Sequence, residues 1–236
     1  MLKRFEELNR TIRNLHTVTG LLQSMGANTE SVFDIEDNYR GSEQIKACLE
    51  RVRAIPEALE LMESRYLGPG IDLDQLSKLP KGTLGYNYAT IMKTLNFDPD
   101  FYRIREISSD EDWLTMRMRK THDIIHVISG FGPSGGELGV LSIQAVQIGY
   151  PVSIFLQTAS LAMALKFRPE ILPGITSQIA RGMSMGLQIK PLIAQRWEEG
   201  WDKPVKQWRQ ELNLTNPVID EPYSMKNRLS QLDLDW

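Results

Sequence analysis

Helical periodicity is the feature that most limits what this chain can fold into. Apolar residues recur at steps of three and four along most of its length, which places them on one face of an α-helix. In residues 4–25, for example, Phe5, Leu8, Ile12 and Leu15 share such a face. No segment alternates apolar and polar residues between hairpin turns, as a half-buried strand would. The sequence therefore predicts an all-α fold, arranged as a multi-helix bundle.

Turn residues divide this pattern into separate helices. Glycine and proline interrupt it near Gly41, through a connector at 67–81, in the stretch 130–136 and at 149–151. Acidic residues at 110–112 suit the positive end of a helix dipole. The predicted helices after the first are 29–38, 42–55, 56–66, 86–95, 110–129, 137–149, 152–166, 169–189 and 192–212.

Composition is typical of a soluble globular protein, with 42% hydrophobic and 24% charged residues. The formal net charge of −3 argues against a nucleic-acid partner, which normally meets a basic surface. The longest apolar stretch, Pro151 to Leu165, is interrupted by polar residues and is shorter than the roughly 20 residues of a spanning helix. Cys48 is the single cysteine, which fits a reducing compartment. We therefore expect a cytoplasmic protein, with contact at the inner face of the membrane as a further expectation.

One group of residues has side chains suited to binding a metal ion. His122 and His126 lie one turn apart on the same face of a predicted helix, so both imidazoles can reach one metal ion. Asp123 is rotated by about 100° from His122 and can reach the same ion or orient a ligand. The glycine-rich break at 130–136 lets the chain reverse, so Glu137 can face the histidines. This HDxxH-x10-E motif across a helix–loop–helix predicts a divalent metal site, with zinc first and iron, manganese or magnesium as alternatives.

A structural role is the alternative for the same residues. Both histidines could be core residues that hydrogen-bond to Asp123 or Glu137. Glu137 could also serve the helix dipole alone, since an acidic residue in a first turn contributes about 0.3–1 kcal/mol.

The helices after the motif are unusually apolar. Pro151–Leu165 and the spaced residues of 171–187 could form an ordinary bundle core, or a tunnel that holds a long hydrocarbon beside the metal. In the next predicted helix, 192–212, Trp197, Trp201 and Trp208 recur at four- and seven-residue steps, which favours a packing stripe. Exposed apolar faces on this helix and on 4–25 would favour a homodimer or a peripheral membrane contact.

Three separated blocks of this sequence resemble one known family. They are LPKGTLGYNYATIMKTLNFDPDFYR at 79–103, HDIIH at 122–126 followed by ten residues and Glu137, and AQRWEEGW at 194–201. In this order they resemble the ubiquinone (coenzyme Q) biosynthesis family Coq-four. The resemblance covers a helical core at 79–214, which leaves 1–66 as an unassigned helical segment and 215–236 as a C-terminal tail.

The resemblance implies an all-helical fold and a metal held by His122, Asp123, His126 and Glu137, which would also be the catalytic residues. It implies a role on prenylated aromatic precursors of ubiquinone, with an isoprenoid or prenylated aromatic lipid and other quinone-biosynthesis enzymes as partners. The implied chemistry is oxidative decarboxylation of a prenylated benzoate ring. The sequence departs from the family in its spacer before Glu137, which has ten residues where eleven are expected. It also lacks a mitochondrial presequence, which suggests a bacterial-type member.

Two other functions remain open at this point. The chain could be a non-catalytic scaffold that presents lipid intermediates to partner enzymes. It could also be a phosphohydrolase built on the adjacent His122–Asp123 pair, although that arrangement needs a further histidine, and the third one, His16, lies 106 residues upstream.

Overall fold

The computed structural model describes Asn9, residues 30–132 and residues 136–218. Over these residues the fold is all-α, and its extended pairing is a single antiparallel bridge between Thr83 and Pro204. The helices are α2 (Glu30–Asn38), α3 (Glu43–Arg53), α4 (Pro56–Glu63), α5 (Leu73–Leu76), α6 (Leu84–Leu95), α7 (Asp110–Ser129), α8 (Glu137–Ile148), α9 (Pro151–Phe167), α10 (Leu172–Gln188) and α11 (Val205–Glu211). The predicted helix at 4–25 and His16 lie outside the described residues.

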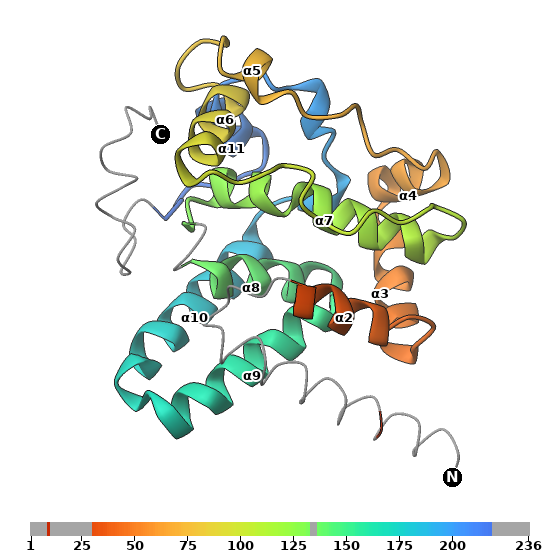
Figure 1. Cartoon of the computed structure of the whole chain (residues 1–236), viewed down its shortest axis with the longest axis vertical. Coiled ribbons are helices and arrows are strands. Elements are labelled where there is room, and N and C mark those ends of the chain that lie inside the picture. The colour runs from red at the N-terminus through yellow and green to blue at the C-terminus, as the bar shows by residue number, and fades with distance from the viewer. Residues whose placement is uncertain (1–8, 10–29, 133–135, 219–236) are drawn as a thin grey trace.

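Helix α7 runs through the middle of the molecule, with α6 and α11 on one side and α8 to α10 on the other (Figure 1). Its C-terminal half, including Ile124 and Ile128, packs into a core shared with α6, α8 and α11. Its N-terminal half, including Trp113 and Met118, packs into a second core shared with α3, α4 and α9. Because nearly every face of α7 is buried, its side chains have fixed positions.

Both ends of α7 are specified locally. Ser109 caps the start, where its hydroxyl oxygen accepts a hydrogen bond from the Asp112 backbone N–H at 3.1 Å. Gly130 ends the helix in the left-handed conformation with φ of 79°. A Cβ atom there would lie 1.9 Å from the Val218 carbonyl oxygen, so glycine is required by both conformation and space. The chain therefore reverses directly after the last turn of α7.

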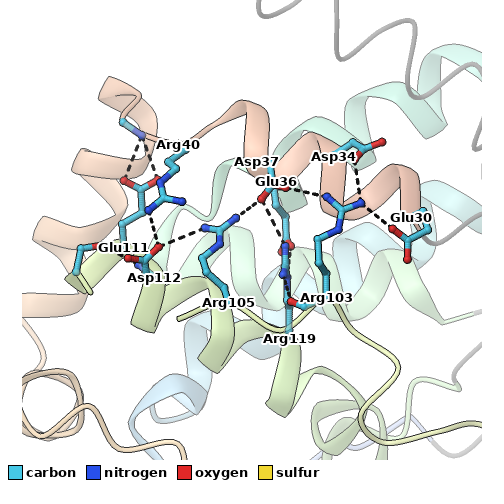
Figure 2. A network of polar contacts seen from close by, with 12 residues as sticks. Glu30, Asp34, Glu36, Asp37, Arg40, Arg103, Arg105, Glu111, Asp112 and Arg119 are labelled. Atoms are coloured by element: carbon cyan, nitrogen blue, oxygen red, sulfur yellow. Dashed lines mark hydrogen bonds and ion pairs between the residues drawn. The ribbon is translucent and has the colours of Figure 1, made fainter. Parts of the chain in front are cut away.

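Helix α2 is tied to α7 and to the segment before it by a network of ion pairs (Figure 2). Arg103 contacts Glu30 at 2.6 Å and Asp37 at 2.9 Å, and these pairs are partly exposed. Arg119 on α7 contacts Glu36 at 2.6 Å, with side-chain exposures of only 2% and 7%. The helices before residue 66 thus pack directly on α7.

The region 192–212 is not the single helix that the spacing predicted. It forms a 3₁₀ turn at Leu192–Ala194, another at Trp197–Glu199, and then α11. The reason is tertiary, since the backbone at 201–205 pairs with the start of α6: the N–H groups of Leu84 and Gly85 donate to the carbonyls of Lys203 and Trp201. Pro204, which cannot donate a backbone hydrogen bond, then precedes α11.

The tryptophans of this region pack in the core from separate elements. The rings of Trp197 and Trp208 lie 4.7 Å apart between centroids, and Trp201 packs against Tyr88 at 5.4 Å. The predicted tail begins in the same core, because the Val218 N–H donates to the Ser129 carbonyl at 2.8 Å and Val218 is buried. Residues 219–236 of the tail lie outside the described residues.

Candidate metal site

His122 and His126 on α7 meet Glu137 at the start of α8. The His122 Nε2 atom lies 3.1 Å from Glu137 Oε1, and His126 Nε2 lies 3.2 Å from Glu137 Oε2. The two imidazole Nε2 atoms are 3.2 Å apart. In the part of the chain that the structure describes, this is the one cluster of three such groups able to share a metal ion.

These separations fit a metal of the zinc type. A tetrahedral site with bonds of about 2.0–2.1 Å has ligand atoms about 3.3–3.4 Å apart. The three contacts of 3.1 to 3.2 Å are close to that edge length, so small shifts would admit an ion. Two imidazoles and one carboxylate also match the ligand set of several catalytic zinc sites.

His126 is held in one tautomer. Its Nδ1 donates to the Phe131 carbonyl at 2.8 Å, and a carbonyl can only accept. In the neutral imidazole the Nε2 lone pair therefore points toward His122 and Glu137. Such a backbone contact is typical of a histidine that binds metal.

The charges of the three groups reinforce each other. Burial opposes the charged form of His122, but the Glu137 carboxylate, with smaller contributions from Asp123 and Glu36, raises the pKa of His122 to about 9. Burial would raise the pKa of Glu137, yet His122 and His126 hold it well below its usual range. A metal ion therefore has to displace a proton that His122 and Glu137 share.

Asp123 lies beside the cluster and is not one of its three members. Its side chain is half-buried. Its charge raises the pKa of His122, after the larger effects of burial and Glu137, and also that of Tyr88, after burial. In this structure Asp123 thus contributes charge near the site, whereas the other three motif residues bring ligand atoms together.

Two residues of the site were not anticipated. The Gln144 side-chain nitrogen lies 3.4 Å from His122 Nδ1, and Ser153 donates to the Gln144 side-chain oxygen at 2.6 Å. Ser153 and Gln157 interrupt the apolar stretch of α9, and both face inward, while Ile154 and Leu165 of the same helix are exposed. In the sequence, the polar residues within an otherwise apolar helix could have indicated that this face of the helix contacts a polar site.

The apolar residues of α9 and α10 only partly form core. Ile175 and Met185 are buried, whereas several others are exposed by 40 to 74%: Ile154, Leu165, Phe167, Met183 and Leu187.

A cavity of about 10 Å³ lies between α7 and α8, lined in part by Thr121, Gln144 and Gln147, and it has room for about one water. Within the described residues, no helix combines the length and the apolar character that crossing a membrane requires.

Comparisons with known proteins agree on one family. A profile described as "Coenzyme Q (ubiquinone) biosynthesis protein Coq4" matches residues 41–218, a wider range than the blocks at 79–214. A crystal structure from Nostoc punctiforme, of a protein provisionally assigned to ubiquinone biosynthesis, superposes with a TM-score of 0.80 and 31% identity, over 90% of this chain and 99% of that one.

Curated relatives carry the same designation. The mitochondrial COQ4 homolog of Aedes aegypti is 26% identical over 154 residues, or 64% of this chain and 55% of that protein. The mitochondrial COQ4 homolog of Anopheles gambiae is 28% identical over 184 residues, or 74% and 63%. The chain therefore spans little more than half the length of these two relatives. Their names place those proteins in mitochondria, so the cytoplasmic location of this chain stays a prediction.

Proposed function

Because this chain belongs to the coenzyme Q (ubiquinone) biosynthesis protein Coq4 family, we propose that it binds a prenylated aromatic precursor of ubiquinone beside a divalent metal. His122, His126 and Glu137 would hold the metal. The observation that carries the proposal is the convergence of their ligand atoms to separations of 3.1 to 3.2 Å.

Zinc is the first candidate for the metal, with iron, manganese and magnesium as alternatives, because imidazole and carboxylate together suit zinc and iron best. When bound, such a metal supplies a Lewis acid that can polarise an oxygen of the substrate's ring carboxylate.

The exposure of the three side chains favours an open site. His126 is 3% exposed, but His122 keeps 27% and Glu137 43% of its side-chain surface. A head group would enter from this exposed side. Since Asp123 lies outside the cluster, the three residues would leave one ligand position of a four-coordinate metal to substrate or water, as in catalytic sites and unlike closed structural ones. This favours an enzyme over a scaffold.

The isoprenoid tail would lie on the apolar side chains of the helices that follow Glu137. Ile154, Leu165 and Phe167 of α9 and Leu187 of α10 are exposed. Lys166 and Arg168, beside Phe167, are exposed as well and would meet acidic lipid head groups at a membrane surface. The same surface is available to partner enzymes of the pathway or to a second copy of the chain.

The reaction proposed for this site replaces the ring carboxyl group by a hydroxyl. The bond from the ring to the carboxyl carbon breaks and carbon dioxide leaves, while the ring carbon gains one oxygen atom of dioxygen. An external two-electron reductant and two protons convert the second oxygen atom to water. In this scheme His122 and Glu137 would hold the metal, and the proton that they share in the metal-free protein would already have left.

Metal analysis and native mass spectrometry of the purified chain, with organic extraction, test the proposal. We expect about one divalent metal per chain, an extractable isoprenoid, and loss of the metal in the His122→Ala/His126→Ala variant. His16→Ala is the control, because it removes a histidine that is not part of the motif. Full metal content in the double variant would refute the metal site.

A hydroxylated product formed from a prenylated benzoate under dioxygen would identify an enzyme. Bound lipid and metal without turnover, in the presence of a reductant, would instead favour the scaffold. Release of phosphate from nucleotides or prenyl phosphates, lost in Asp123→Ala, would favour the phosphohydrolase.

A further inference from the structure

The interface between α8 and α9 contains two buried pairs of the same composition. Ser153 donates to the side-chain oxygen of Gln144 at 2.6 Å, and the Ser142 hydroxyl oxygen lies 3.3 Å from the side-chain oxygen of Gln157. All four residues are at most 5% exposed.

Only the first pair continues to the metal site. The Gln144 amide lies 3.4 Å from His122 Nδ1, on the side of the ring opposite to Glu137. The Ser142 hydroxyl donates instead to the Leu138 carbonyl at 2.6 Å, which is a local contact within α8, and the buried amide nitrogen of Gln157 has no hydrogen-bond partner among the residues that the structure describes. The two pairs therefore differ in their relation to His122 and agree in residue type, burial and interface.

The chemistry of His122 defines what Gln144 must provide. An imidazole that binds metal through Nε2 carries its hydrogen on Nδ1, and so does a fully protonated imidazole. Both forms need an acceptor at Nδ1, and the oxygen of the Gln144 amide can supply it once the amide is turned by about 180°, which exchanges its oxygen and nitrogen.

The partner of Gln144 tolerates both orientations. A serine hydroxyl can donate to the amide oxygen, as it does here, or accept from the amide nitrogen. The Ser153–Gln144 pair can therefore present either an acceptor or a donor to His122.

We infer that Gln144, held by Ser153, is a positioning residue that sets the tautomer and ring orientation of His122 for metal binding. This inference rests on the proposed function. Gln144 would have the same role at His122 as the Phe131 carbonyl has at His126, so that the Nδ1 atom of each imidazole has its own acceptor. The acceptor at His122 is adjustable, whereas the one at His126 is fixed.

The test compares Gln144→Leu with Gln157→Leu, the matched control in the same interface. Zinc affinity is measured by competition with a chromophoric chelator, and thermal unfolding of the metal-free proteins is measured in parallel. We expect both variants to fold, but only Gln144→Leu to lose about 10- to 100-fold in zinc affinity. Gln144→Glu, which can only accept, should keep wild-type affinity or exceed it.

A second readout is the ¹⁵N chemical shift of the His122 ring. In zinc-loaded wild-type protein we expect a hydrogen on Nδ1, and in Gln144→Leu a weaker or exchanging signal at that atom. Equal zinc affinities and equal His122 spectra in Gln144→Leu and Gln157→Leu would overturn the inference while leaving the proposed function intact. Failure of the wild-type protein to bind zinc, iron or manganese would overturn the proposed function itself, and the inference with it.

Discussion

The ion pairs that α2 makes with α7 and with the segment before it allow a quantitative prediction (Figure 2). They join the same kinds of side chain, arginine and a carboxylate, and differ mainly in burial. Arg119 and Glu36 are only 2% and 7% exposed, whereas Arg103 is 40% exposed in its own pairs. Removing one partner of a buried ion pair leaves an unpaired charge and costs about 3–5 kcal/mol. An exposed pair contributes about 0–1 kcal/mol. We therefore expect Arg119→Met to lower the free energy of unfolding by several times as much as Arg103→Met.

The environment of Glu36 supports this ranking. Burial raises the pKa of Glu36 even though Arg119 and the Tyr150 hydroxyl lower it, so desolvation is the larger effect on this carboxyl. Tyr150 donates to Glu36 at 2.8 Å and would be its remaining partner in Arg119→Met. Replacing both charged residues, in Glu36→Met/Arg119→Met, should consequently cost less than Arg119→Met alone.

Urea unfolding and calorimetry measure the difference. For a chain of this size 1 kcal/mol corresponds to about 2–4 °C, so Arg119→Met should lower the Tm by about 6–20 °C, and Arg103→Met, which removes three exposed pairs, should lower it by less. Equal losses in the two single variants would refute the argument from burial. A double variant less stable than Arg119→Met would refute the argument from desolvation.

Four further predictions concern α7 and the candidate site. The pKa of His122 in the folded protein, about 9, lies above its ordinary 6.5. Protonated His122 therefore stabilises the metal-free protein fully below pH 6.5, and this stabilisation is lost as the pH rises through 9. Unfolding temperatures measured across this pH range should fall as the pH rises. Glu137→Gln should bring the pKa of His122 toward its ordinary value and remove most of that pH dependence, and an unchanged NMR titration of His122 would contradict the ion pair. Zinc affinity should rise over the same window in wild-type protein, because the metal displaces the proton. Gly130→Ala should destabilise the fold by more than about 1 kcal/mol, since it combines a left-handed backbone with a Cβ atom 1.9 Å from the Val218 carbonyl oxygen; an unfolding free energy equal to that of the wild type would show that the turn adapts.

The sequence by itself determined the helical class and the core of the site. Apolar residues three and four positions apart, acidic residues at 110–112 and a glycine after 129 are local signals, and α7 begins and ends where they predict. His122 and His126 converge for the same reason, since one helical turn separates them whatever surrounds the helix. The glycine-rich break similarly predicted that Glu137 turns back toward them.

Tertiary structure alone decided the rest. Backbone groups at 201–205 form hydrogen bonds with the start of α6 and the residues just before it, more than 100 positions earlier in the chain, and this competition replaced the helix predicted at 192–212. Contact between α8 and α9 brought Gln144 and Ser153 behind His122, and it turned polar residues of α9 inward while apolar ones remained exposed. Spacing along one helix cannot encode such contacts, because they depend on how two helices cross and not on the period of either.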